Sequence, residues 1–439
     1  MSLLGRTPAP PRTHILIGHT HWDHIQGFPF FTPVFLPGTE INIYAPLEFQ
    51  RSLEEALSGQ MQYSYFPVKL EDLSSRIHYT ELDEGFFRIG DCLVETQYLN
   101  HTAPTIAYRL TEGATGVAYV TDHELFWKSS GANFEHPGDQ RHIEFIRDAD
   151  LAIHDAQYSE EEYLAKVGWG HSPVSYVRDV AISANVRQLA LFHHDPTHDD
   201  DWIDEMQSAF RAGLAQRNSP MKVFTAAEGL ELTIEGQGSQ HDIAGDSALR
   251  QRSILGGRVM VISPNEYDFT LIEHMLIEDG LILMPIADPE SVGKRAAEFS
   301  PDLVILDSSL SVTNGRQVVQ ELRDATGVSA LPIVLLTDSR HEIPDGESAK
   351  GEATDYLERP FSPPMLRSRV RAWLARTLSA RVQQKQARVE PVGTDEPLDG
   401  TKGPSDSGYA KALSKTKLFR HLDAWPMPTG YCLDTRRIH

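Results

Sequence analysis

The chain has 439 residues, a formal net charge of −22 at neutral pH and two cysteines, Cys92 and Cys432. This length leaves room for two or three domains, while two cysteines exclude a disulfide framework and a cysteine-based zinc site. The negative charge disfavours nucleic acid and anionic membranes as partners, and without a bilayer-length apolar run or an apolar N-terminal signal segment we expect a cytoplasmic protein.

A dense group of metal-capable side chains lies near the start of the chain. The apolar run Ile15–Ile17 predicts a buried strand that is followed by His19, His21, Asp23 and His24. Imidazole nitrogens and carboxylate oxygens are ligands that zinc, manganese and iron accept. Residues two apart at the end of a strand point the same way. We therefore expect His19 and His21 to hold one ion, and Asp23 and His24 to turn toward a second.

This HxHxDH pattern resembles the signature of the metallo-β-lactamase superfamily. The resemblance implies an αββα sandwich, in which two mixed sheets pack between helices, and two bound divalent metal ions. We expect zinc, with manganese or iron as alternatives. The superfamily normally places several strands ahead of this motif, whereas few residues precede His14 here. We therefore expect either a translation start further upstream or a sheet that lacks its first strands and is exposed at its edge.

The resemblance also assigns three ligands further along the chain, each after a predicted strand. His101 completes the first site, Asp122 bridges the two ions after the strand Val117–Val120, and His193 completes the second site, with His194 as the alternative. A shared carboxylate is chemically sensible because its two oxygens can serve both cations.

Asp23, Asp155 and His171 are the predicted catalytic residues. His154 and Asp155, in DLAIHDAQY, resemble a motif of the tRNA 3′-processing endonuclease and its phosphodiesterase relatives, in which Asp155 takes the acidic position. A carboxylate there can orient a histidine acid. His171 precedes a helix that starts at Ser172-Pro173, and it either acts on the leaving group or helps to cap this helix. His123 is either a supporting group outside the ligand set or a solvated loop residue.

Together these features predict a dinuclear metal-dependent hydrolase that acts on a small anionic phosphodiester or similar ester. The phosphodiesterase branch is favoured over the lactamases by Asp122, by the HDAQ stretch and by EGLEL in the predicted closing strand, Lys222–Ile234. Large RNA is disfavoured as a substrate, because the segment between Asp122 and His154 is short and holds no basic arm.

The composition of the chain indicates where its domains begin and end. We expect residues 1–235 to form the hydrolase domain, the Gly-, Ser-, Gln- and Asp-rich residues 236–257 a linker, and residues 258–376 a second domain. Its alternating strands and helices predict a flavodoxin-like, five-stranded parallel sheet. Residues 377–439 are expected to be a disordered tail, in which Ala410–Asp423 resembles the first helix of a cyclic-nucleotide-binding domain.

The second domain resembles a response-regulator receiver. Asp307 in DSSLSVTNG matches the phospho-acceptor, Thr337 and Tyr356 match the hydroxyl and aromatic switch positions, and Arg359 replaces the lysine. Ser263-Pro264 replaces the acidic pair that holds Mg²⁺, which disfavours phosphoryl transfer to Asp307. A pseudo-receiver that serves as a docking or dimerisation surface is therefore the alternative.

The receiver implies a histidine kinase or another signalling protein as a partner, and a homodimer is a further expectation. The alternative function is a non-catalytic signalling adaptor, in which the receiver mediates protein interaction and the hydrolase domain is inert. Metal content separates this adaptor from a phosphorelay-linked hydrolase.

Overall fold

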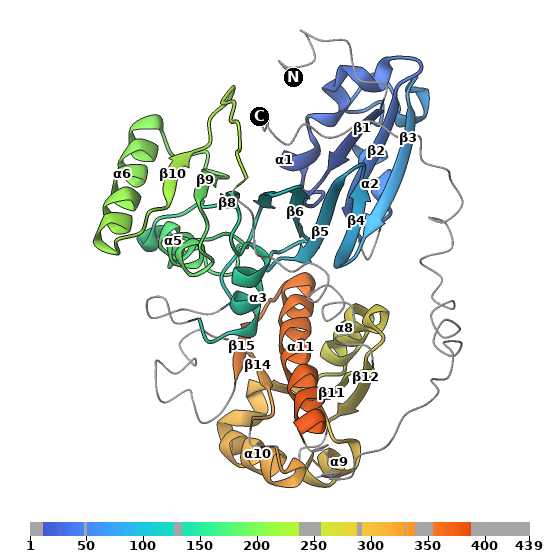
Figure 1. The fold of residues 1–439 in the computed structure, drawn as a ribbon. Helices are drawn as coiled ribbons and strands as arrows, with labels where there is room; N and C mark the ends of the chain where they lie inside the picture. Colours follow the sequence, from blue (N-terminus) through green and yellow to red (C-terminus); the bar gives the residue numbers. More distant parts are fainter. Residues whose placement is uncertain are drawn as a thin grey trace, which may run out of the picture.

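The computed structural model describes residues 12–47, 51–126, 134–236, 256–287, 292–328, 330–338 and 354–387. The strands form sheets of three, seven and five members, of which the first two lie in one domain and the third in another (Figure 1). Among the described residues, no helix has both the length and the apolar character needed to cross a membrane.

The first domain contains ten strands and six α-helices among its described residues. In chain order its strands and α-helices are β1 (Arg12–Leu16), α1 (Trp22–Ile25), β2 (Glu40–Pro46), α2 (Leu53–Gln60), β3 (Arg76–Leu82), β4 (Gly85–Ile89), β5 (Cys92–Tyr98), β6 (Ile106–Glu112), β7 (Thr115–Val120), α3 (Pro137–Phe145), β8 (Leu151–Asp155), α4 (Glu160–Tyr163), α5 (Val174–Ser183), β9 (Gln188–Phe192), α6 (Asp200–Gln216) and β10 (Lys222–Thr225).

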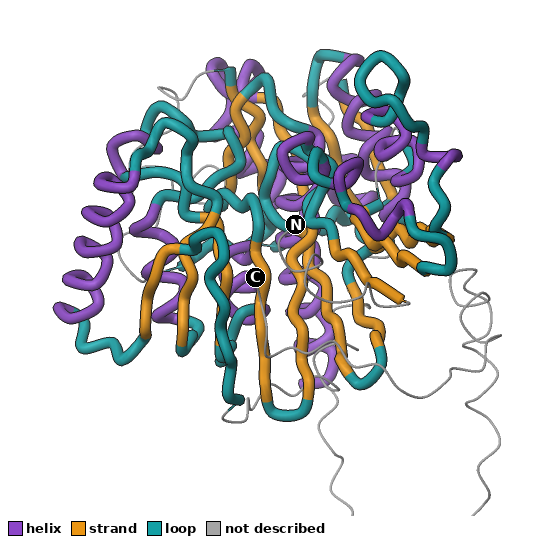
Figure 2. Tube along the Cα trace, turned by 90° about the horizontal axis from the view of Figure 1, so that it is seen from above, coloured by secondary structure: helices purple, strands orange, loops and turns teal. Residues whose placement is uncertain are grey.

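The two sheets of this domain pack against each other between helices. The small sheet has the order β1-β2-β3 and is parallel, and β1 lies at its edge. The large sheet has the order β10-β9-β8-β7-β6-β5-β4, parallel from β7 to β10 and antiparallel from β4 to β7. Apolar side chains of both sheets meet between them. The rings of Tyr44 and Phe87 stack there, with 5.1 Å between their centroids. Helices flank the strands in Figure 2, and the predicted αββα sandwich is confirmed.

Each sheet has a helical layer on its outer side, which packs against apolar side chains of the strands. Leu53 and Leu57 of α2 pack in one core with Ile41 and Ile43 of β2. Helices α3, α5 and α6 cover the large sheet over a second core that includes Phe145, Val177, Leu189 and Phe210. The predicted closing strand begins correctly at Lys222 but ends at Thr225 and not at Ile234. Gly229 shortly afterwards has φ +78°, which extended strands do not accommodate.

The topology brings the predicted site residues to one end of the strands. Strands β7, β8 and β9 are parallel neighbours, so their carboxyl ends lie at the same edge of the sheet. Asp122 follows β7, Asp155 ends β8 and His193 follows β9. His101 follows β5, and His19 follows β1 of the other sheet.

The second domain is a parallel sheet with the order β12-β11-β13-β14-β15, which confirms the flavodoxin-like prediction. Its described strands and α-helices are β11 (Arg258–Ile262), α8 (Glu266–Leu276), β12 (Ile282–Ile286), α9 (Val292–Phe299), β13 (Leu303–Asp307), α10 (Ser311–Thr326), β14 (Ile333–Thr337), β15 (Asp355–Glu358) and α11 (Pro363–Ala387). Helix α11 continues beyond residue 376, where the tail was expected to begin. Residues 237–255 of the expected linker and 388–439 of the tail, including Ala410–Asp423, lie outside the described residues.

Helix α11 lies where the two domains meet, with its N-terminal end beside α3 (Figure 1). The guanidinium group of Arg369 on this helix donates to the carbonyl of Phe126 (2.8 Å) in the first domain. Arg371, two residues further along the helix, pairs with Asp83 (3.0 Å). Both arginine side chains are buried, so the two domains share an interior polar interface.

Candidate metal centre

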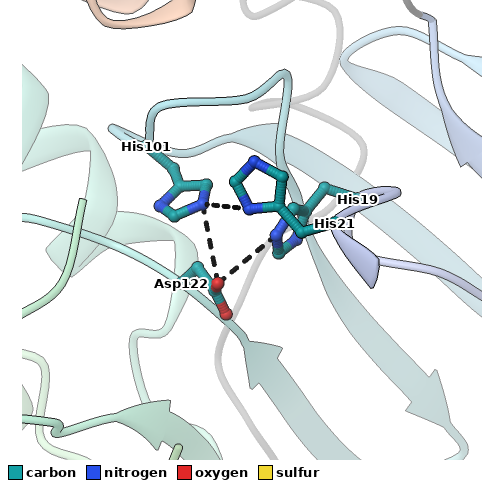
Figure 3. A group of neighbouring side chains, drawn as sticks. All are labelled: His19, His21, His101 and Asp122. Atoms are coloured by element: carbon teal, nitrogen blue, oxygen red, sulfur yellow. Dashed lines mark hydrogen bonds and ion pairs between the residues drawn. The ribbon is translucent and has the colours of Figure 1, made fainter. Parts of the chain in front are cut away.

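Asp122 lies at the centre of a histidine cluster that draws on both sheets (Figure 3). Its Oδ2 atom is 3.3 Å from Nε2 of His19, 3.3 Å from Nε2 of His24 and 3.6 Å from Nε2 of His101. Its Oδ1 atom is 3.4 Å from Nε2 of His193. The two oxygens of one carboxylate therefore face histidines that the sequence assigned to two different metal sites.

The predicted ligands fall into two groups, within each of which the candidate ligand atoms all lie within 4.8 Å of one another. The first group is His19, His21, His101 and Asp122, and the second is Asp23, His24 and His193. Asp122 and His193 also form a third such group with His171, the predicted catalytic histidine. The second group is nearer to solvent, since the Asp23 side chain is 59% exposed. The structure thus brings together all seven predicted ligands.

The donor atoms in this cluster fit a cation. Both ring nitrogens of His19 are buried without a hydrogen bond, as is Nδ1 of His193, and buried polar atoms without partners are costly. Burial lowers the pKa of His19, and it lowers that of His101 to about 4, so both rings are neutral and offer lone pairs. Burial alone would raise the pKa of Asp122, but His24 and the other histidines hold it far below its usual range. Neutral imidazoles around an ionised carboxylate are a donor set that zinc accepts.

The orientation of His101 is fixed by a residue that the sequence reading missed. The ring Nδ1–H of His101 donates to the carbonyl of Gly170 (2.9 Å), which leaves Nε2 as the ligand atom. Gly170 has φ +91°, and a Cβ at this position would collide with the His101 ring. Glu124, buried beside the cluster, accepts hydrogen bonds from the backbone N–H groups of Gly168 and Gly170 and so holds this loop. The Gly-Trp-Gly spacing was the only sequence signal for the turn.

Asp155 and His171, two of the predicted catalytic residues, lie side by side. Nδ1 of His171 lies 3.0 Å from Oδ2 of Asp155, and the His171 ring stacks on His193 with 4.9 Å between centroids. Burial lowers the pKa of His171, but Asp155 and neighbouring carboxylates raise it more, so the net shift is upward. Asp155 also accepts from the backbone N–H of His123 (2.9 Å). His123 is fully buried, so the solvated-loop alternative for this residue was wrong.

Of the two adjacent histidines after β9, only His193 lies in the cluster. His193 adopts φ +60°, a left-handed conformation that is unusual for histidine and that turns the chain at the end of the strand. His194 belongs to no group of metal-capable side chains within the described residues. The geometry therefore favours His193 as the ligand.

Two of the predicted receiver residues, Asp307 and Arg359, also meet. A terminal nitrogen of Arg359 lies 2.9 Å from Oδ2 of Asp307 and 2.6 Å from Oδ2 of Asp268, a carboxylate on α8 that the sequence reading missed. The hydroxyl of Ser263 is 3.1 Å from both carboxylates. Burial raises the pKa of Asp307, but Ser309 and Arg359 lower it more. Of the two switch positions, Thr337 ends β14 and Tyr356 lies on β15, and both are buried.

Comparison with known families gives two matches. Residues 3–194 match the family model of a beta-lactamase superfamily domain, and residues 259–371 match that of a response regulator receiver domain. Ribonuclease Z of Oceanobacillus iheyensis is 23% identical over 235 residues, which cover 44% of this chain and 74% of the relative.

The second half of the chain has a different relative. The alkaline phosphatase synthesis transcriptional regulatory protein PhoP of Bacillus subtilis is 31% identical over 136 residues, or 31% of this chain, and the chain spans 56% of the length of PhoP.

Among solved structures, the metallo-beta-lactamase fold protein YhfI of Bacillus subtilis aligns with a TM-score of 0.37 and 18% identity over 52% of this chain and 80% of that one.

Proposed function

Because residues 3–194 belong to the beta-lactamase superfamily and residues 259–371 to the response regulator receiver domains, we propose that this protein is a hydrolase with two divalent metal ions that is linked to a signalling receiver. The observation that carries the proposal is the position of Asp122, whose two oxygens lie 3.3–3.6 Å from four histidines. A structural carboxylate needs no such ring of imidazoles.

The ligands are assigned by group. His19, His21 and His101 hold the first ion, Asp23, His24 and His193 hold the second, and Asp122 lies between them. Zinc suits this imidazole-rich donor set, with manganese or iron as alternatives. A bound pair of such cations lowers the pKa of water and offsets negative charge on the substrate.

His171 acts as the general acid in this proposal. Its Nδ1 atom is engaged by Asp155 (3.0 Å), so the imidazole orientation is fixed and Nε2 is the nitrogen that delivers a proton to the leaving group. The contact with Asp155 stabilises the protonated ring until the transfer occurs. Asp23, the most exposed member of the second group, lies where an incoming substrate would meet the cluster.

The proposed substrate is a small anionic phosphodiester or a similar ester. The resemblance to ribonuclease Z, which acts on RNA by its name, supports phosphodiester chemistry. The formal net charge of −22 argues against a long polyanion. We also propose a cytoplasmic location, and a histidine kinase or another signalling protein as the partner of the receiver. Asp307 remains the candidate phospho-acceptor, although Arg359 already neutralises its carboxylate.

Hydrolysis of bis(p-nitrophenyl) phosphate by the full-length protein tests this function. Zinc-loaded wild type is expected to release p-nitrophenol, and Asp122→Asn is expected to lose the activity because the bridging charge is removed while the side-chain shape is kept. Asp91→Asn, in the exposed turn after β4, is the control that keeps full activity. A wild type that binds no zinc and shows no turnover would support the inert adaptor in place of the hydrolase.

A further inference from the structure

The loop that carries His101 is held by the receiver domain. The hydroxyl of Ser362, directly before α11, donates to the carbonyl of Thr102 (2.7 Å). Ser368 on the same helix has its hydroxyl 3.1 Å from the carbonyl of Met365, and the same hydroxyl lies 3.4 Å from Oδ1 of Asn100. Asn100 and His101 are almost fully buried, whereas the contact between Ser362 and Thr102 is partly buried. One neighbour of a predicted metal ligand, Thr102, is thus bound by a side chain of the other domain, and a second side chain of that domain lies close to the other neighbour, Asn100.

The same loop is connected to the segment after Asp122. The side-chain amide of Asn100 donates to the carbonyls of Glu124 (2.9 Å) and Leu125 (3.2 Å). The backbone N–H of Glu124 donates in return to the carbonyl of Asn100 (2.8 Å). These bonds fix the position of His101 relative to Asp122, and a displacement of the loop that breaks them changes that position.

The segment before Ser362 begins at Arg359, close to the carboxylates of Asp307 and Asp268 in the receiver. Arg359, three residues before Ser362, bridges Asp307 (2.9 Å) and Asp268 (2.6 Å) through one guanidinium nitrogen. Charge-assisted contacts of this kind are stronger than neutral hydrogen bonds. The ion pair therefore fixes where the chain leaves β15 and where Ser362 meets Thr102.

We propose that Ser362 is a positioning residue for the metal centre, and that the ion pair between Arg359 and Asp307 holds it in place. The receiver then holds the loop that carries His101 through one hydrogen bond, from the hydroxyl of Ser362 to the carbonyl of Thr102. This inference rests on the proposed metal-dependent function. Unlike that function, it requires a hydrogen bond from Ser362, a residue outside the first domain.

Zinc affinity of the full-length protein tests the proposal, measured by competition with a chromophoric chelator. Ser362→Ala is expected to weaken the binding of zinc about fivefold, the equivalent of one neutral hydrogen bond. Ser362→Thr keeps a hydroxyl and is expected to restore the affinity. Ser379→Ala is the matched control, because Ser379 is an exposed serine on the same helix α11. Excess zinc is expected to restore kcat in Ser362→Ala, which a general loss of structure would prevent.

The role of the ion pair is tested by Asp307→Asn, which removes the charge and keeps the side-chain shape. This variant is expected to weaken zinc binding by a similar factor, and the double variant with Ser362→Ala is expected to bind no more weakly than either single variant, because both act through one contact.

The outcomes separate the two proposals. A wild type that binds no zinc overturns the proposed function and this inference together. If the wild type binds zinc and the Ser362→Ala variant binds zinc as tightly as the Ser379→Ala variant, the positioning role alone is overturned. If the effects of Asp307→Asn and Ser362→Ala on zinc affinity are strictly additive, the proposed link from Asp307 through Arg359 to Ser362 is overturned.

Discussion

Nε2 of His136 lies 2.8 Å from Oδ2 of Asp355, and both side chains are buried at the interface of the two domains. Nδ1 of His136 accepts the backbone N–H of Gly138 at the start of α3, so Nε2 carries the proton and donates it to the carboxylate. Asp355 also accepts from Arg369 (2.9 Å) and from the indole of Trp373 (3.0 Å). One carboxylate therefore joins β15 and α11 of the receiver to α3 of the first domain.

Asp355→Asn is expected to destabilise the interface, because Arg369 and His136 would face an uncharged group in a buried site. The loss of one partner in a buried pair costs about 3 kcal/mol. Urea unfolding followed by circular dichroism measures the change in the free energy of unfolding, and the transitions of the two domains are expected to separate. Asp204→Asn, on the exposed face of α6, is the control. An unchanged unfolding curve for Asp355→Asn would show that the domains do not depend on this contact.

The same carboxylate predicts a pH dependence. Burial raises the pKa of Asp355, but Arg369 and His136 lower it more, to about 2. Because the folded-state pKa lies below the unfolded value of about 4, the ionised group stabilises the fold above pH ~4, and this contribution is lost as the pH falls toward 2. The difference in unfolding free energy between wild type and Asp355→Asn should stay constant from pH 7 to about 4 and shrink below it. A difference that grows on acidification would contradict the assignment.

Gly170→Ala is expected to weaken the binding of zinc at the first group by at least about tenfold, as is typical when the partner of a ligating histidine is disturbed. The new Cβ would displace the His101 ring that Gly170 now orients. Gly113→Ala is the matched control, since Gly113 also has a positive φ (+58°) but a Cβ added there would meet no atom within 4 Å. Both variants should lose about 1 kcal/mol of stability from backbone strain. Equal zinc affinities for the two variants would exclude the proposed role of Gly170.

His171→Ala is expected to separate proton transfer from metal binding. If His171 protonates the leaving group, kcat should fall about 100-fold or more on diphenyl phosphate, whose leaving group needs a proton. The loss should be much smaller on bis(p-nitrophenyl) phosphate, whose leaving group is the more acidic phenol. His274→Ala, at an exposed position on α8, is the control. Loss of zinc from His171→Ala, or equal losses on both esters, would identify His171 as a ligand and not as the acid.

Local patterns in the sequence were sufficient for most of the fold, whereas the candidate ligand cluster was predicted from the HxHxDH pattern together with the resemblance to the metallo-β-lactamase superfamily. Four of the predicted ligands lie within His19–His24, and the other three follow β5, β7 and β9, whose carboxyl ends lie at one edge of the large sheet. The predicted strand beyond Thr225 failed because alternating apolar residues do not outweigh Gly229 at φ +78°.

What could not be predicted depends on contacts between residues far apart in the chain. Glu124 reads as an ordinary acidic residue, and its role depends on the distant loop at Gly168–Gly170. Asp268 lies on a helix, with no motif to connect it to Arg359. The contact between Ser362 and Thr102 spans two domains. Such contacts have no periodicity or spacing in the sequence.

Anomalous diffraction at the zinc edge, from crystals of the zinc-loaded full-length protein, tests the central proposal most directly. Two anomalous peaks are expected on either side of Asp122, one among His19, His21 and His101 and the other among Asp23, His24 and His193. A single peak, or peaks away from Asp122, would contradict a centre with two metal ions.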